Sequence, residues 1–521
     1  MSKIILCFDG TSNDPKDAKQ KRNLKMELKD ASVSNIFKLH LLLGGELRKG
    51  KDAFFPEQKS FYYSGVGTYG SKFVQWFNAA LALPNMDVAK IINKAVDDLS
   101  KIYKNGDEVF VFGFSRGAAI ARRFAAVVDE KIKDHSITIR FLGVFDTVAS
   151  IGYPNLDDDS KPVSDVRFEN CTLADNVEEA LHMLSLDEKR TAFMPTLMAD
   201  DKRVTEIWFA GAHSDIGGGY RYDGLADIAL HFLIEEFTRR NLGLEVRTPL
   251  QIDFDRPEYK KMGLAYDDMA IQPNPLGKSH QQDRSFLLEW TLSDRDMRVH
   301  TENAVPPNGP ALLPKVHYTV MERIHGDSDY RPVSLSRRTL DGEVENQVPH
   351  CIWRPDGEKP KTVYGLAEHL KKGPPAAKKL EIGQERKVTV YANQKLNRSY
   401  VYANRGERYS FKVKMDQKWF DSGIICDPAG WDRDSEDFPW YQDIAIKFME
   451  DERRCPAAKW FEIVGVVGKK SQVPFQALEF NGNKDFEVKE NTGEFFLFAN
   501  DLEDRYSNNL GFIEVRIARK G

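Results

Sequence analysis

The chain has 521 residues, of which 41% are hydrophobic and 29% are charged, and this length predicts two or three globular domains. Its 74 basic and 79 acidic residues give a formal net charge of −5, which argues against a nucleic-acid-binding protein. The sequence contains no run of about 18 apolar residues, and this excludes a membrane-spanning helix.

The five cysteines lie at positions 7, 171, 351, 426 and 455 and form no CxxC pair. This usage predicts reduced thiols and folding in the cytoplasm, although Cys426 and Cys455 fall in one predicted domain and can pair. The first apolar stretch, Ile4 to Phe8, is too short for a signal peptide and ends at Asp9. We therefore expect a protein that is cytoplasmic in the producing cell and that, if it acts outside, leaves without a cleavable leader.

The first half of the chain alternates predicted strands with predicted helices. A helix is predicted from Met86 to Tyr103, because apolar residues recur on one face and Asn105-Gly106 then stops it. The predicted strands are Lys3 to Phe8, Val109 to Phe112, Ile139 to Phe145 and Glu206 to Ala210. This alternation predicts an α/β fold with a mostly parallel sheet, helices on both faces and a site at the carboxyl ends of the strands.

The segment Gly113-Phe114-Ser115-Arg116-Gly117 lies between a predicted strand and a predicted helix. A serine on such a strand-to-helix turn is typical of a nucleophile elbow, in which glycines tolerate close backbone contacts on either side. The turn also aims a helix N-terminus at an oxyanion that forms beside the serine. The alternative interpretation is a glycine-rich turn with an inert serine.

An activated serine needs a base to take its proton and an acid to orient that base. Asp146 ends the strand Phe141 to Phe145, and His213 follows the apolar run Ile207 to Ala212. Taken singly, the aspartate can be a turn cap and the histidine a satisfied loop residue. The order Ser115, Asp146, His213 is that of α/β-hydrolases, so we predict a triad with Ser115 as nucleophile and His213 as general base.

Two features near the predicted triad leave alternatives open. Asp215 is a second candidate acid, although its place two residues after His213 favours a role in bracing the loop. The run Gly217-Gly218-Gly219 can also be an anion cradle.

For the oxyanion we expect the backbone N–H of Arg116 and one from Gly10 or Thr11, because the turn after the first strand should abut the elbow. This chemistry needs no cofactor.

The second half of the chain changes character. Residues from about 250 to 345 carry prolines, charges and few clean periods, and we interpret them as insertions or a lid on a catalytic domain that spans 1–370. Residues 371–385 read as a linker, because they include Lys371-Lys372-Gly373-Pro374-Pro375. Alternating strand patterns follow in Val388 to Tyr391, Tyr409 to Val413 and Phe512 to Ile517, and they predict an all-β sandwich over 386–521.

Six ordered segments resemble one known family, the α/β-hydrolases typified by type VI secretion phospholipase effectors. These segments are Phe8-Asp9-Gly10-Thr11, Tyr62 to Thr68, Gly113 to Ala118, Gly143 to Thr147, Leu184 to Arg190 and Trp208 to Tyr220. The resemblance spans roughly residues 3 to 335. It implies a Ser115–Asp146–His213 triad and a lipase or phospholipase that cleaves acyl esters of phospholipids.

The same resemblance implies an antibacterial effector that is injected into the periplasm of a target cell, with a secretion spike protein and an immunity protein as partners. The stretch Trp76 to Pro84 is more apolar than expected between the family motifs. It is either a buried helix or a surface that docks on a phospholipid membrane through Trp76, Phe77, Leu81 and Leu83.

The C-terminal residues Asn491-Thr492-Gly493 and Asn500 to Gly511 resemble the end of the bacterial galactophilic calcium lectin called PA-IL. The resemblance implies a calcium ion held by Asp501, Asn508, Asn509 and the carbonyl of Arg505, and a carbohydrate as partner. Oxygen-only ligands suit this hard cation. An Asx-rich turn without an ion is the alternative, and the sugar-contacting histidine of that family has no counterpart, since no histidine follows His369.

Two classes of function therefore compete. One is a lipolytic esterase, acting on phospholipids or on soluble esters as a carboxylesterase, with an accessory β-sandwich. The other is a carbohydrate-binding or docking protein on an inactive hydrolase fold. The presence of Ser115, Asp146 and His213 together favours the enzyme.

Overall fold

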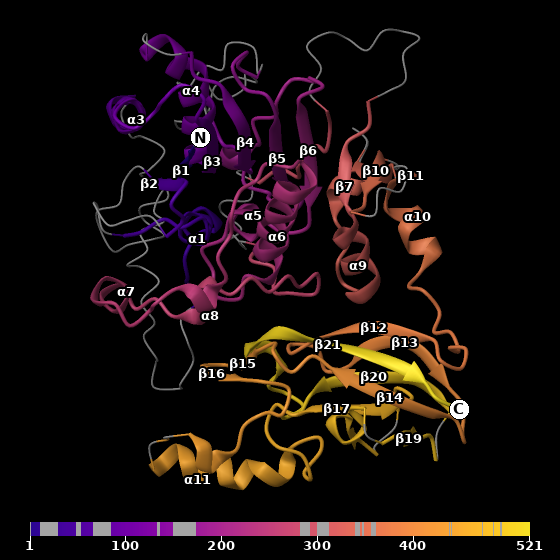
Figure 1. The fold of residues 1–521 in the computed structure, drawn as a ribbon. Coiled ribbons are helices and arrows are strands. Elements are labelled where there is room, and N and C mark those ends of the chain that lie inside the picture. The colour runs from indigo at the N-terminus through magenta and orange to yellow at the C-terminus, as the bar shows by residue number, and fades with distance from the viewer. Residues whose placement is uncertain are drawn as a thin grey trace. The chain divides into compact units, whose positions relative to one another are not determined.

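The structure is a computed structural model. It describes residues 2–10, 30–47, 54–65, 85–132, 136–149, 173–281, 292–299, 312–338, 344–345, 348–355, 361–436, 438, 440–470, 473–482, 484–489 and 492–521. The chain divides into two compact units, of which the first reaches Gly373 and the second begins at Pro374 (Figure 1). The predicted stretch Trp76 to Pro84, Thr11 and Cys171 lie outside the described residues.

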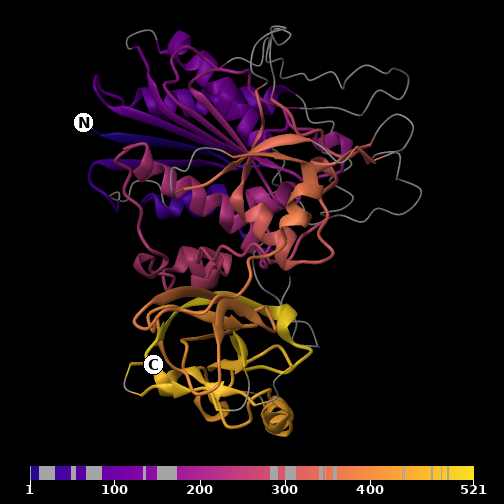
Figure 2. The same cartoon turned by 90° about the vertical axis from the view of Figure 1, so that its right-hand side faces the viewer.

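The first unit is built on a nine-stranded sheet in the order β11-β10-β7-β6-β5-β4-β3-β1-β2. Figure 2 shows the twist of this sheet and the helices that lie on either side of it. All neighbouring strands pair in parallel except β10 and β11. The strands are β1 (Lys3–Phe8), β2 (Gln58–Tyr63), β3 (Glu108–Phe114), β4 (Ile139–Phe145), β5 (Ala180–Ser185), β6 (Val204–Phe209), β7 (Lys315–His317), β10 (Pro349–Trp353) and β11 (Lys361–Tyr364). The predicted fold class, a mostly parallel sheet with a C-terminal β region, is confirmed.

Helices cover both faces of this sheet, and the alternation along β1 shows how. Ile4 and Leu6 pack into one core with α3 (Asn85–Ser100) and α4 (Arg116–Lys131). Ile5 and Cys7 point to the other face and pack with α1 (Asn35–Leu42) and α6 (Gly224–Arg239). Successive side chains of a strand face opposite ways, so a strand buried on both faces reads as one apolar run.

Within the range that the sequence assigned to insertions or a lid, the structure differs. Lys315–His317 forms β7 and pairs with both β6 and β10, so this part belongs to the sheet itself. A strand of three residues is too short to show a period, which is why it left no signal in the sequence. The other elements here are α7 (Pro257–Met262), α8 (Tyr266–Met269), α9 (Tyr318–Gly326), β8 (Arg337–Arg338) and β9 (Val344–Glu345). The segment that follows β11 forms α10 (Gly365–Lys372).

The second unit consists of antiparallel sheets that bury two apolar clusters. One sheet runs β16-β15-β21-β14-β19 with β12 also paired to β21, and the other runs β13-β20-β17-β18. Along β21 every second residue from Asn509 to Ile517 is buried, as expected for a strand with one face on the core. The elements are β12 (Glu385–Tyr391), β13 (Asn397–Ala403), β14 (Arg408–Val413), β15 (Trp419–Asp421), β16 (Ile424–Cys426), α11 (Trp440–Met449), β17 (Ile463–Val467), β18 (Phe475–Gln476), β19 (Phe486–Glu487), β20 (Gly493–Ala499) and β21 (Asn509–Arg519).

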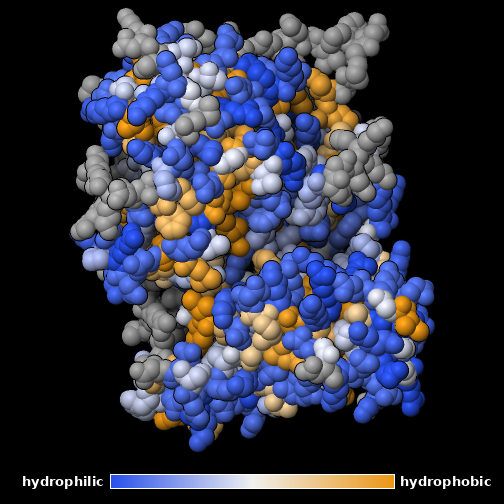
Figure 3. All heavy atoms as spheres, viewed as in Figure 1, coloured by the Kyte–Doolittle hydropathy of each residue, from blue (hydrophilic) through white to orange (hydrophobic). Residues whose placement is uncertain are grey.

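Cys426 and Cys455 are both buried and free, so the alternative that they pair is wrong. Hydrophilic residues predominate on the face of the molecule shown in Figure 3. Among the described residues, no helix has both the length and the apolar composition needed to cross a bilayer.

Candidate functional site

Ser115 lies in the turn between β3 and α4, where the backbone is strained. Its φ of 57° and ψ of −123° are unusual for a residue other than glycine. A Cβ on Gly117 would lie 2.3 Å from the carbonyl oxygens of Phe8 and Asp9, and one on Gly113 would lie 2.7 Å from the Cα of Ala118. The predicted need for glycine on both sides of the serine is therefore confirmed by the packing.

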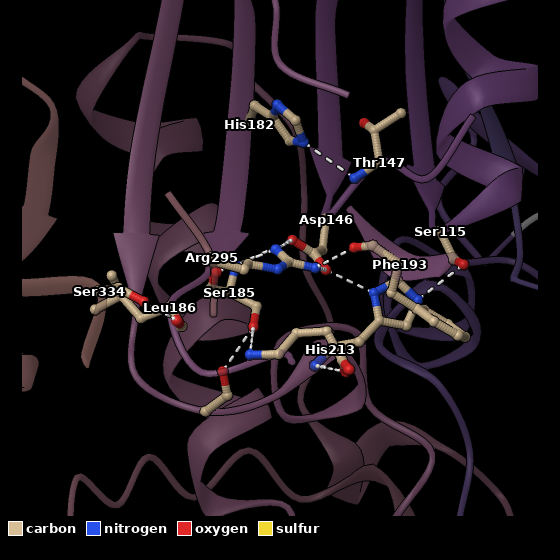
Figure 4. A network of polar contacts seen from close by, with 12 residues as sticks. Ser115, Asp146, Thr147, His182, Ser185, Leu186, Phe193, His213, Arg295 and Ser334 are labelled. Atoms are coloured by element: carbon tan, nitrogen blue, oxygen red, sulfur yellow. Dashed lines mark hydrogen bonds and ion pairs between the residues drawn. The ribbon is translucent and has the colours of Figure 1, made fainter. Parts of the chain in front are cut away.

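The structure brings the three predicted side chains into one hydrogen-bonded chain (Figure 4). Ser115 Oγ lies 2.8 Å from His213 Nε2, and His213 Nδ1 lies 2.6 Å from Asp146 Oδ2. With a neutral imidazole, Nδ1–H donates to the carboxylate and Nε2 accepts from the hydroxyl. The relative exposures of Ser115, His213 and Asp146 are 7%, 3% and 0%, so water hardly competes for these bonds.

His213 is the first residue of the short helix α5 (His213–Gly217), and residues 210–212 connect it to the end of β6. Its ring packs between the rings of Phe114 and Phe193, whose centroids are 4.7 and 4.8 Å away. Its backbone N–H donates to Glu188 Oε2 at 3.2 Å. Both the ring and the backbone of the histidine are therefore held in place.

Asp146 follows β4 and also has a positive φ, 37°. Its carboxylate accepts four hydrogen bonds, from Ser185 N, His213 Nδ1 and two nitrogens of Arg295. Burial alone raises the pKa of Asp146, but the Arg295 guanidinium and the His213 imidazole outweigh it and hold that pKa well below its usual value. The aspartate is thus a fixed anion.

Burial lowers the pKa of the His213 imidazole, although the Asp146 and Glu188 carboxylates favour its charged form. A neutral histidine with Nε2 turned to a serine hydroxyl is in the state that a general base needs.

The segment Leu184 to Arg190, for which no separate role was predicted, contacts the loop that carries His213. Ser185 Oγ donates to Gly211 O, Asp187 Oδ2 accepts from Gly211 N, and both contacts tie the loop before His213 to the end of β5. Glu188 pairs with Arg190 through two bonds of 2.7 Å. Burial raises the pKa of Asp187 to about 6.

Two of the amides expected to bind the oxyanion, those of Arg116 and Gly10, lie among the described residues. Arg116 begins α4, so its backbone N–H lies at a helix N-terminus directly after the serine. The N–H of Gly10 donates instead to Asp9 Oδ1 at 2.6 Å, so this amide already has an acceptor. Asp9 is buried and also accepts from Ser34 and Tyr62, which fixes the turn.

Asp215 braces the loop rather than serving as the acid. Its Oδ2 accepts from Ala212 N, and its Oδ1 lies 2.6 Å from His280 Nδ1. The neighbouring glycines have a packing role, since a Cβ on Gly217 would lie 2.0 Å from the Phe114 ring and one on Gly218 would lie 2.6 Å from Asn35 N. These contacts explain the glycines without an anion.

A second polar cluster lies in the C-terminal unit. Asp501 is 3% exposed and accepts from Leu502 N and Asn509 Nδ2. The buried amide oxygens of Asn508 and Asn509 have no hydrogen-bond partner among the described residues. The predicted ligand Arg505 O faces the same turn, where it accepts from Asn508 N at 3.5 Å.

The structure adds Asp421, which the sequence analysis missed, to this cluster. Asp421 lies opposite Asn509 in the pairing of β15 with β21, and directly opposite residues of antiparallel strands share a face. Burial and the charge of Asp501 raise the pKa of Asp421 to about 8. Two carboxylates beside unpaired amide oxygens fit a hard divalent cation. No group of three His, Cys, Asp or Glu residues that could bind a metal occurs in the described part of the chain.

The family model "T6SS, Phospholipase effector Tle1-like, catalytic domain" matches residues 2–132 and 127–236. The resemblance to type VI secretion phospholipase effectors is confirmed for this part of the chain.

Individual proteins are similar over smaller shares. An uncharacterized protein of Saccharomyces cerevisiae, YEL023C, is 26% identical in an alignment of 245 residues, and the match covers 36% of this chain and 32% of the yeast protein. A structure of the Tle1 effector bound to the VgrG spike from the type 6 secretion system is 24% identical, covers 42% of this chain and 51% of that one, and has a TM-score of 0.27. The EclA N-terminal domain, a PllA-like lectin, is 16% identical, covers 26% of this chain and 95% of that one, and has a TM-score of 0.18. The chain thus spans about a third of the yeast protein and about half of the Tle1 effector.

Proposed function

Because residues 2–236 match the catalytic domain of Tle1-like phospholipase effectors, we propose that the chain is a serine hydrolase that cleaves acyl esters of phospholipids. The observation that carries the proposal is the buried hydrogen-bonded chain from Ser115 through His213 to Asp146.

In this mechanism His213 Nε2 takes the proton from Ser115 Oγ as that oxygen attacks the ester carbonyl. Asp146 holds the Nδ1–H tautomer and stabilises the imidazolium that forms. The backbone N–H of Arg116, at the start of α4, stabilises the oxyanion. His213 then returns the proton to the leaving alcohol, and water hydrolyses the acyl-enzyme by the same steps in reverse.

The lipid substrate rests on the family match rather than on the geometry of the triad. The same match supports delivery by type VI secretion into a target cell's periplasm, with a spike protein and an immunity protein as partners. A soluble-ester carboxylesterase would share the site, and activity on short-chain esters above that on phospholipid would favour it. If the hydrolase fold is inactive and serves only binding, neither phospholipids nor short-chain esters would be hydrolysed.

The test is a comparison of wild type with Ser115→Ala, using phospholipid vesicles, short-chain esters and a serine-directed fluorophosphonate. We expect the phosphonate to label Ser115 and the fatty acid product to disappear in the variant. Ser60→Ala is the matched control, because this partly buried serine of β2 contacts His40 of α1 and not the triad. Labelling elsewhere, or full turnover by Ser115→Ala, refutes the proposal.

A second function is favoured by the two unpartnered amide oxygens in the C-terminal unit. There Asp501, Asn508, Asn509, Arg505 O and Asp421 would hold a calcium ion, which would supply coordination sites for sugar hydroxyls. Titration of the full chain with calcium chloride, with Asp501→Asn as the control, tests this role. Absence of both binding heat and thermal shift in the wild type contradicts it.

A further inference from the structure

We propose that Arg295 is a positioning residue of the active site, which fixes the Asp146 carboxylate and cancels its charge so that His213 stays a neutral base in mildly acidic solution. The inference rests on the proposed hydrolase function. Arg295 lies in the range that the sequence analysis assigned to insertions or a lid, outside every motif of the resemblance.

The contact between Arg295 and Asp146 is bidentate. Nη1 lies 2.6 Å from Oδ1 and Nη2 lies 2.8 Å from Oδ2, with the two side chains 1% and 0% exposed (Figure 4). The same two nitrogens donate to Ser185 O at 3.1 Å and Phe193 O at 2.6 Å. Four acceptors therefore hold the guanidinium in place. Its two nitrogens, Nη1 and Nη2, form a planar fork that fits one orientation of the carboxylate.

That orientation decides which oxygen meets the histidine. Asp146 Oδ1 accepts from Ser185 N and Arg295, which leaves Oδ2 to accept from His213 Nδ1. Without the fork the carboxylate can rotate about its terminal bond, and the Nδ1–H tautomer of the imidazole loses its fixed partner.

The charges that face His213 balance. Asp146 comes from the end of β4, Glu188 and Arg190 from the segment after β5, and Arg295 from the segment 292–299. Two carboxylates and two guanidinium groups cancel formally, so the imidazole gains little by taking up a proton. Removal of Arg295 leaves an uncompensated buried carboxylate beside His213, and an opposite charge nearby raises the pKa of an imidazole.

The experiment measures the rate of Ser115 labelling by a fluorophosphonate from about pH 4.5 to 9, in wild type, Arg295→Met and Arg295→Lys. For Arg295→Met we expect the midpoint of the acid limb to rise by about one pH unit and the plateau rate to fall about 10- to 100-fold. Arg295→Lys keeps the charge without the fork, so its midpoint should stay near that of the wild type while its plateau falls.

Arg247→Met is the matched control. Arg247 is buried too and donates to Leu41 O and Gly45 O, but it contacts no triad residue among the described ones. Arg247→Met should lose thermal stability as Arg295→Met does, but the midpoint of the acid limb of its labelling rate should stay at the wild-type pH.

The outcomes separate the two claims. A folded Arg295→Met variant with unchanged midpoint and plateau overturns the role of Arg295. If that variant does not fold, a wild-type plateau in Arg295→Lys overturns the positioning role. Failure of the wild type to label at Ser115 instead overturns the hydrolase proposal.

Discussion

The polar clusters of the two units differ in how their buried groups are satisfied. In the first, the Ser115 hydroxyl, both His213 nitrogens and both Asp146 oxygens have protein partners. In the second, the side-chain oxygens of Asn508 and Asn509 have none among the described residues. A buried polar atom without a partner costs free energy. In the first cluster the atom without one among the described residues is a donor, Nε of Arg295, whereas the second cluster leaves two acceptor oxygens that a cation could use.

The largest expected effect tests whether the first cluster works as a unit. Asp146→Asn puts an amide where His213 and Arg295 need an acceptor, so it should lower kcat about 10³- to 10⁴-fold. Turnover of a soluble ester at saturating concentration measures this effect. A chelator should leave the wild-type rate unchanged, and loss of turnover on chelation would show that hydrolysis needs a metal ion.

The second prediction concerns the backbone that holds the elbow. Gly117→Ala forces a Cβ against the carbonyl oxygens of Phe8 and Asp9, which are backbone atoms that cannot swing away. We expect the free energy of unfolding of this variant to be about 3 kcal/mol lower than that of the wild type, and denaturant titration measures the difference. Gly373→Ala is the control. A φ of 58° strains any residue with a side chain, but no atom lies within 4 Å of the Cβ that alanine would add at this position. Equal losses would mean that close packing is not what requires Gly117.

The third prediction tests whether a calcium ion binds at the second cluster. Calcium at 100 times its dissociation constant should stabilise the C-terminal unit by about 2.7 kcal/mol, because it binds the folded form alone. Thermal unfolding of the full chain with and without calcium measures the shift.

The control for the calcium effect is Asp421→Asn. It removes one of two mutually repelling carboxylates, so we expect higher stability in chelator and a smaller calcium shift. A calcium shift as large as that of the wild type would remove Asp421 from the site.

The smallest effect concerns His280, which contacts Asp215 and Asp30 beside the first cluster. Burial alone lowers the pKa of His280, but bonds to Asp215 and Asp30 outweigh it and raise that pKa to about 9. The folded state therefore favours the protonated form, and this stabilisation is full below pH 6.5 and lost as the pH rises through 9. His280→Gln should lower the free energy of unfolding by about 2 kcal/mol at pH 6 and by less at pH 9.5, and urea unfolding measures both values.

The groups facing His280 are Asp215, Asp30 and the stacked Tyr220 ring, with Lys278 bound to Asp30. A stability gap between wild type and His280→Gln that does not change with pH would assign the contribution to the ring stack instead.

Four strands of the sheet, β1, β3, β4 and β6, could be predicted from the sequence, as could the elbow and the positions of Ser115, Asp146 and His213, because each of these is local. Buried parallel strands read as apolar runs, and the glycines around Ser115 stand at fixed offsets from it. The order of strand ends along the chain was then enough to place the three residues at one sheet edge.

Which distant groups join the two clusters could not be read from the sequence and became clear from the fold. Arg295 is 149 residues from Asp146 and lies in a segment without periodicity, so nothing in its neighbourhood marks it. Asp421 reaches Asn509 only through the pairing of β15 with β21. The position of Gly10 after the first strand predicted an oxyanion donor, but in the structure its backbone N–H donates to Asp9 Oδ1. Charge neutralisation and hydrogen-bond satisfaction act through space, and a linear pattern carries no record of which partners the fold brings together.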